Sequence, residues 1–114
     1  MLRVLCRCAS TTASLAPTPL PIYVLRYSFV ENMVERRLPY REAHLKLLMN
    51  EKACLLGGAM GDAKSGMLLF TSKDACIKFA DADPYVSEGL VLNKTIELWN
   101  TVAGTLHPPL SSSR

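Results

Sequence analysis

Residues 53–71, ACLLGGAMGDAKSGMLLFT, contain two short apolar segments on either side of a polar turn. The first segment covers residues 53–60 and ends in glycines, the turn covers residues 61–65, and the second segment covers residues 66–71. Two apolar runs joined by a short loop that contains glycine are typical of an antiparallel hairpin. We therefore expect a β-hairpin near the centre of this chain of 114 residues.

On the N-terminal side, the hairpin follows a predicted strand and a predicted helix. Residues 22–29, IYVLRYSF, are aromatic and β-branched and contain no breaker, which predicts a strand. Pro39 suits the first helical position, and we expect a helix from there to about residue 50. A spacing of about 100° per residue places the following residues on its inner face: Tyr40, Ala43, His44, Leu47 and Leu48. Arg41, Lys46 and Asn50 are then expected to point outward.

On the C-terminal side, a second helix and a last strand follow. Ser72 is a good N-cap, and the apolar residues after it predict a short helix that ends before Pro84. Residues 90–99, LVLNKTIELW, predict the final strand. The order βαββαβ predicts an α+β, ferredoxin-like fold, in which an antiparallel sheet carries two helices on one face. The other face needs cover, so we expect a homodimer through this open sheet face.

The two ends of the chain differ from the body in composition. Residues 1–21 contain Arg3 and Arg7, several Ser and Thr and no acidic residue, and they end in a proline-rich stretch. This composition is typical of a mitochondrial transit peptide, and a disordered tail on a cytoplasmic protein is the alternative. Residues 22–100 are expected to form the single domain. Residues 101–114 contain two prolines and end in SSSR, which predicts a disordered tail.

Charge and hydropathy exclude two classes of partner. The formal net charge is +3, but residues 22–113 contain as many Lys and Arg as Asp and Glu, ten of each. A neutral body without a basic stripe is a poor match for phosphate backbones, so we expect no nucleic-acid binding. No apolar run approaches the roughly 20 residues that span a bilayer, so we expect no membrane insertion.

Cysteine and glycine patterns indicate neither a metal nor a cofactor. Of four cysteines, only Cys54 and Cys76 belong to the body, and no C-x-x-C pair is present. Both are expected to be small buried hydrophobic residues. Gly57 and Gly58 are not followed by a phosphate-binding G-x-x-x-x-G-K-[ST] motif. Since His44 has no His, Cys or Glu set around it, we predict no metal site and no cofactor.

His44 and Asp83 are the residues that could carry acid/base chemistry. His44 is the only histidine of the body and lies on the inner face of the first predicted helix. Asp83 precedes Pro84, where the second helix has to end. Helices on one face of the sheet can bring the two together, and a carboxylate there would orient the imidazole as a general base. Spacing alone favours the alternative, a histidine bonded within the core and an aspartate that caps a turn.

Several short motifs together resemble the YciI-like (YCII-related) family. They are Arg41-Glu42-Ala43-His44-Leu45, Leu56-Gly57-Gly58, Gly66, Ala82-Asp83-Pro84-Tyr85 and Gly89-Leu90. The resemblance covers residues 22–99 and implies the dimeric α/β-barrel type of the fold, with a pocket that contains a His44–Asp83 dyad. We expect Tyr40, Gly58 and Tyr85 to contact the substrate there. The Gly-Pro that often follows the second strand in this family is Gly58-Ala59 in this chain.

Two classes of function follow from these expectations. In the first, the protein is a small-molecule enzyme in which His44 moves a proton and Asp83 orients His44, a chemistry that fits elimination, isomerisation or hydrolysis. In the second, it is a non-catalytic dimer, either a metabolite-binding module or a structural subunit of an organellar assembly. An enzyme requires His44 and Asp83 within hydrogen-bonding distance beside an open cavity. A structural module predicts a sealed histidine with a backbone partner.

Overall fold

The computed structural model describes residues 19–107. The elements, in chain order, are β1 (Leu20–Phe29), α1 (Met33–Arg36), α2 (Leu38–Asn50), β2 (Cys54–Met60), β3 (Ser65–Phe70), α3 (Lys73–Ala82), α4 (Pro84–Ser87) and β4 (Val91–Thr101). Most of them belong to one compact unit, Pro21–Trp99. The predicted transit peptide falls almost entirely outside the described residues, and so does the last part of the predicted tail, residues 108–114.

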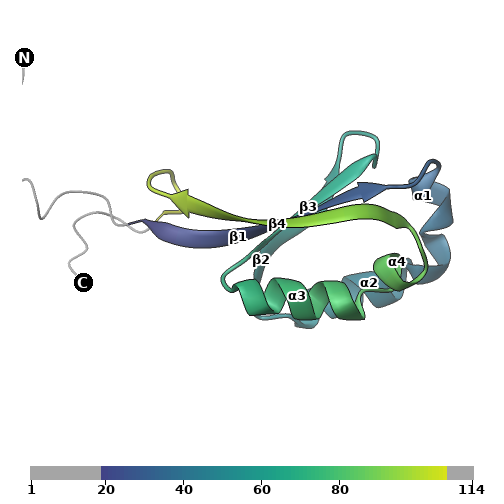
Figure 1. Ribbon diagram of the computed structural model, residues 1–114, viewed down its shortest axis with the longest axis horizontal. Coiled ribbons are helices and arrows are strands. Elements are labelled where there is room, and N and C mark those ends of the chain that lie inside the picture. Colours follow the sequence, from purple (N-terminus) through teal and green to yellow (C-terminus); the bar gives the residue numbers. More distant parts are fainter. Residues whose placement is uncertain (1–18, 108–114) are drawn as a thin grey trace, which may run out of the picture. The chain divides into compact units, whose positions relative to one another are not determined.

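The four strands form one antiparallel sheet in the order β2-β3-β1-β4. The hairpin expected from the sequence is β2 and β3, whose register pairs Gly57 with Leu68 and Gly58 with Met67. In turn, β3 pairs with β1 and places Leu68 opposite Leu25. Figure 1 shows α2, α3 and α4 below the sheet, while its upper face carries no helix. The predicted α+β, ferredoxin-like βαββαβ architecture is confirmed.

The main core lies between the sheet and α3. Because side chains alternate between the two faces of a strand, β1 directs Leu25 and Tyr27 toward the helices, and β3 directs Leu68 and Phe70 the same way. All four are at most 3% exposed. They pack against the inner face of α3, formed by Ala75, Cys76, Phe79 and Ala80. Ser72 caps this helix as expected, since its hydroxyl accepts a hydrogen bond from the Ala75 amide at 3.1 Å.

Two short helices were not predicted from the sequence. The first, α1, follows Asn32, which adopts a left-handed conformation with φ of 59°. It is anchored by Met33, which is 2% exposed and belongs to a second cluster with Val30, Ala63, Tyr85 and Leu90. The second, α4, starts at Pro84, directly after α3 ends. A helix of four residues has too little hydrophobic periodicity to be recognised from sequence.

The end of β4 differs from the predicted tail, which begins at residue 101. Thr101 is the last residue of β4, and its hydroxyl donates to the Leu20 carbonyl at 2.7 Å. A turn follows, in which the His107 amide donates to the Gly104 carbonyl at 3.0 Å. The His107 ring atom Nε2 lies 3.1 Å from the Thr101 carbonyl oxygen. Among residues 19–107, no helix has the length and apolar character needed to cross a bilayer.

Candidate functional site

His44 and Asp83 form a buried pair between α2 and the junction of α3 and α4. The atoms His44 Nδ1 and Asp83 Oδ1 are 2.8 Å apart. His44 is 8% exposed, and Asp83 is fully buried. Pro84 cannot continue α3, so Asp83 adopts an extended conformation at the C-cap of α3 and the N-cap of α4. This break in the helix is what directs the carboxylate back toward α2.

Both carboxylate oxygens of Asp83 accept hydrogen bonds from buried donors. Its Oδ2 accepts a hydrogen bond from the Tyr27 hydroxyl at 2.8 Å, and its Oδ1 accepts one from the Tyr85 amide at 3.0 Å. Burial raises the pKa of Tyr27, and the neighbouring Asp83 carboxylate raises it further, so the phenol keeps its proton and donates it. These two fixed donors favour an ionised carboxylate, which is an acceptor only. His44 Nδ1 is therefore the donor in this contact, and in the neutral form of the ring the lone pair is then on Nε2.

The imidazole of His44 is also held by aromatic rings. The Tyr85 ring stacks on it with centroids 3.8 Å apart and an interplanar angle of 3°. Phe79 meets it edge-on, with centroids 5.8 Å apart. Among residues 19–107, none forms a hydrogen bond with Nε2. The ring is thus fixed in orientation, and the basic nitrogen is the atom left for a ligand.

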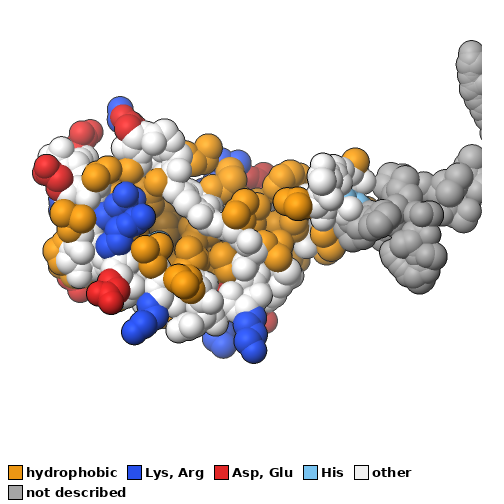
Figure 2. Space-filling view, turned by 180° about the vertical axis from the view of Figure 1, so that it is seen from behind, with side chains coloured by type: hydrophobic (Ala, Val, Ile, Leu, Met, Phe, Trp, Pro, Cys, Tyr) orange, Lys and Arg blue, Asp and Glu red, His pale blue; other side chains and the backbone are white. Residues whose placement is uncertain are grey.

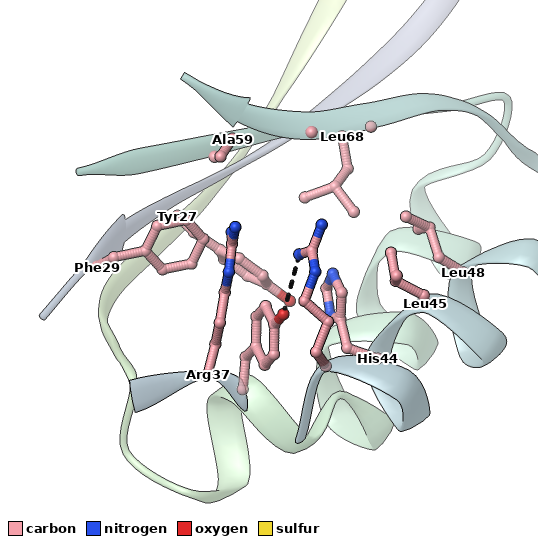
Figure 3. Close-up of a pocket in the computed structure, with 13 residues that line it drawn as sticks. Tyr27, Phe29, Arg37, His44, Leu45, Leu48, Ala59 and Leu68 are labelled. Atoms are coloured by element: carbon pink, nitrogen blue, oxygen red, sulfur yellow. Dashed lines mark hydrogen bonds between the residues drawn. The ribbon is translucent and has the colours of Figure 1, made fainter. Parts of the chain in front are cut away.

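A cavity of about 160 Å³ lies next to His44, between α2 and the strands β1, β2 and β3. Its walls combine aromatic and aliphatic side chains with strand glycines and two arginines: Tyr27, Phe29, Arg37, Arg41, His44, Leu45, Leu48, Gly57, Gly58, Ala59, Gly66, Leu68 and Tyr85. Figure 3 shows Arg37 rising from the helical side toward the strands, with Leu45 and Leu48 on the far side of His44. The space-filling view of Figure 2 shows hydrophobic side chains gathered around a hollow, with a basic group beside it.

The structure brings most of the predicted site residues together. His44, Gly58 and Tyr85 line the cavity, and Asp83 supports His44 from behind. Tyr40 does not line it, because its ring packs against the cluster that contains Val30 and Met33. Tyr40 is partly buried beside that cluster, and its expected contact with the substrate stays a prediction.

The two adjacent glycines of β2 have different roles. A Cβ at Gly57 would lie 3.2 Å from Leu68 Cγ and 3.4 Å from Leu48 Cδ2, two walls of the cavity. A Cβ at Gly58 would meet nothing within 4 Å. Since neighbouring residues of a strand face opposite sides, Gly58 contributes backbone to the cavity, while Gly57 leaves room inside it.

Arg37 and Arg41 are cavity residues that were not predicted from the sequence. The expectation that Arg41 points outward was wrong: it lines the cavity, and its Nη1 donates to the Tyr85 hydroxyl at 3.4 Å (Figure 3, dashed line). Arg37 lies at the junction of α1 and α2. The spacing of Arg37, Arg41 and His44 is i, i+4, i+7, which places all three on one helix face. That spacing was the available signal.

The described part of the chain offers no metal centre. Within residues 19–107, no three His, Cys, Asp or Glu side chains are grouped so that they could hold a metal ion. Of the residues that line the cavity, His44 is able to transfer a proton, and Arg37 and Arg41 are able to bind an anion.

Comparison with solved structures identifies the fold. A dehydrochlorinase from Burkholderia phenoliruptrix, which acts on 5-chloro-2-hydroxyhydroquinone and was solved with 2,5-dihydroxybenzoquinone, matches with a TM-score of 0.59 and 23% identity. The match covers 69% of this chain and 93% of that protein. A protein from Agrobacterium tumefaciens matches with a TM-score of 0.50 and 10% identity, over 78% of this chain and 98% of that one. Both matches agree with the α+β, ferredoxin-like fold described above.

No family model matches the sequence, and no curated protein matches it. The likeness to the dehydrochlorinase and to the Agrobacterium protein, at 23% and 10% identity, shows the fold alone.

Proposed function

We propose that this protein is a YciI-like enzyme that acts on a small molecule, with His44 and Asp83 as its acid/base pair. The observation that carries the proposal is the contact of 2.8 Å between His44 Nδ1 and the buried carboxylate of Asp83, on a ring that opens to a cavity. The motifs around both residues, which resemble that family, support the same assignment. Elimination, isomerisation and hydrolysis each require one positioned proton acceptor of this kind.

The proposed chemistry uses the free nitrogen of His44. In the neutral ring, Nε2 takes a proton from a substrate in the cavity, and the ring becomes positively charged. The carboxylate of Asp83 stabilises that charge through the Nδ1 hydrogen bond, as an oriented histidine requires. The same proton can then be delivered to a leaving group or to a neighbouring carbon. A positioned acid/base group of this type contributes about 10²–10⁴-fold to a rate.

Proton transfer by His44 can be tested before the natural substrate and product are identified. Ligands are first found by thermal-shift screening of small phenols, ketones and carboxylic acids, including 2,5-dihydroxybenzoquinone, the molecule bound in the similar dehydrochlorinase. Bound compounds are then followed by NMR in D₂O for enzyme-dependent exchange of carbon-bound protons or for turnover. We expect the wild-type protein to be active and His44→Gln to lose activity while its circular dichroism spectrum shows that it is still folded.

His107→Gln is the matched control, because it makes the same substitution at a histidine that does not line the cavity. It is expected to keep the wild-type rate. A wild-type protein that binds ligands but promotes neither exchange nor turnover would support the non-catalytic alternative, a metabolite-binding dimer. A His44→Gln variant that retains the full rate would overturn the proposed role of His44.

We also propose that the protein is a homodimer through the open face of the sheet. On that face, a hollow of about 350 Å³ is lined by Val24, Arg26, Met67, Glu97, Leu98 and Trp99. Ile96 of β4 packs against the core under the helices, so Trp99, three positions later, points to the open face, where it is 51% exposed. Exposed apolar area of this kind marks an interaction surface, and the fold supports a second copy as the occupant.

Import into mitochondria is proposed from composition. Residues 1–21 carry Arg3 and Arg7 and no acid, which favours such an address. A fluorescent protein fused after residue 21 is expected to enter mitochondria and to remain in the cytosol when residues 1–21 are deleted. Cytosolic fluorescence of the complete fusion would overturn this proposal.

A further inference from the structure

We propose that Arg37 and Arg41 form an anion-binding site in the cavity, and that its ligand is a planar organic anion about one ring in size, a carboxylate or an acidic phenol. The inference rests on the proposed function, because the cavity is the one that contains His44. It adds the chemical class of the substrate, which the His44–Asp83 pair alone leaves open.

The first argument is charge. Arg37 and Arg41 both line the cavity, and none of the residues that line it is acidic. Within residues 19–107, the only ion pair is that of His44 with Asp83, so neither arginine is neutralised by a carboxylate. The oxygens of Asp83 are occupied by Tyr27, His44 and the Tyr85 amide. Two uncompensated guanidinium groups in a confined space favour an anion.

The second argument is an unused donor. Among the described residues, Arg37 Nε is the one buried side-chain nitrogen or oxygen without a hydrogen-bond partner. A buried donor without an acceptor is costly, and native proteins rarely contain one without a reason. A ligand oxygen that draws the Arg37 guanidinium further into the cavity would satisfy it. The guanidinium fork then suits a carboxylate, which can accept two parallel hydrogen bonds.

The third argument is size and wall chemistry. The cavity measures about 160 Å³, and an apolar protein cavity of roughly 150 Å³ holds one benzene molecule. Phe29, Leu45, Leu48 and Leu68 provide apolar walls around the charged groups. The combination fits a ring with one or two ionised oxygens better than a small inorganic anion, which would leave the apolar walls without contacts.

Arg37, Arg41 and His44 are arranged so that a ligand bound by the arginines also lies next to His44. All three lie on one face of the α1–α2 region and line one cavity. An anionic oxygen held by the guanidinium groups places the rest of the ring within the same space as His44 Nε2. A proton removed from that ring leaves charge that the arginines can stabilise, which is the usual role of fixed positive groups in such sites.

Binding of benzoate and of its neutral isostere benzamide, measured by isothermal titration calorimetry, tests the inference. The variants are Arg37→Gln and Arg41→Gln, and the matched control is Arg36→Gln. Arg36 is exposed and does not line the cavity, so the same substitution there changes net charge but not the site. Charge-assisted hydrogen bonds of this kind are expected to favour benzoate over benzamide by about tenfold or more.

We expect Arg37→Gln and Arg41→Gln each to remove most of this preference and Arg36→Gln to keep it. Equal binding of benzoate and benzamide to the wild-type protein, or no binding of benzoate, would overturn the inference, and so would an equal loss in Arg36→Gln. The wild-type comparison remains decisive if a variant fails to fold. The His44→Gln variant separates the anion-binding proposal from the proposed proton transfer. We expect this variant to bind benzoate like the wild-type protein, so failure of proton transfer would not remove the evidence for the anion site.

Discussion

Asp83 holds three parts of the molecule with one carboxylate. It accepts from Tyr27 on β1, from the His44 ring on α2 and from the first turn of α4 at the Tyr85 amide. All of these contacts are buried, so water cannot replace them when the carboxylate is removed. The residue therefore stabilises the fold as well as the orientation of His44.

We expect Asp83→Ala to lower the free energy of unfolding by about 3 kcal/mol or more, since each buried donor left unpaired costs about 1–3 kcal/mol. Asp81→Ala is the control, because Asp81 is exposed on the same helix and its removal should change stability by less than about 0.5 kcal/mol. Urea denaturation measures both. Equal, small effects would show that the Asp83 network contributes little to folding.

The free energy of unfolding should also decrease at alkaline pH. Burial raises the pKa of the Cys76 thiol to about 11, and burial followed by Asp83 raises the pKa of Tyr27. A group whose pKa is raised by folding stabilises the protein below its unfolded pKa and loses that contribution as pH rises through the folded value. The unfolded values are about 8.5 for Cys and about 10 for Tyr, so the loss should begin near pH 8.5.

The measurement is the urea midpoint at a series of pH values, and Cys76→Ala is the informative variant. It removes the thiol and should flatten the decrease between about pH 8.5 and 11, while the loss due to Tyr27, which begins near pH 10, remains. An identical pH profile for the wild-type protein and Cys76→Ala would contradict the assigned shift.

At the scale of elements, the sequence predicted what depends on local pattern and failed where long-range packing decides. The strands of the hairpin follow from their own residues, and the end of α3 follows from Pro84. Arg41 was assigned to the outer face of α2 because a charge is normally solvated, yet its long side chain reaches the cavity and meets Tyr85, 44 positions later. The contact between His44 and Asp83 likewise joins residues 39 positions apart, which motif resemblance indicated and spacing alone left open.

The hairpin gives a direct test of the cavity. Gly57→Val adds side-chain volume next to Leu68 and Leu48, so we expect it to abolish the benzoate-induced thermal shift. Gly58→Val places its side chain on the opposite face of β2 and should weaken binding less. Leu56→Val is the control for a changed strand residue, because Leu56 is exposed and does not line the cavity. If Gly57→Val binds benzoate like the wild-type protein, the ligand lies elsewhere.

At the scale of the whole molecule, the two faces of the sheet differ in how they are covered. Helices cover one face (Figure 1). Trp99 points to the other face, opposite to the core-facing Ile96 of the same strand, and is 51% exposed. We expect Trp99→Lys to convert the proposed dimer into a monomer, because a charge placed in a closing apolar interface is left without solvent. Ile77→Lys, at an exposed apolar position on α3, should leave the mass unchanged. Light scattering after size-exclusion chromatography measures the mass of both variants, and a dimeric Trp99→Lys would reject this interface.

Asp83 both stabilises the fold and orients His44, and this double role has an evolutionary consequence. A lineage that stopped using the reaction would still be selected to keep this aspartate, because the start of α4 and the hydroxyl of Tyr27 depend on it. Arg37 has no such partner in the described chain, so it would drift as soon as its ligand disappeared. Among descendants of this fold, persistence of the arginine should therefore track continued use of the cavity more closely than persistence of the aspartate does.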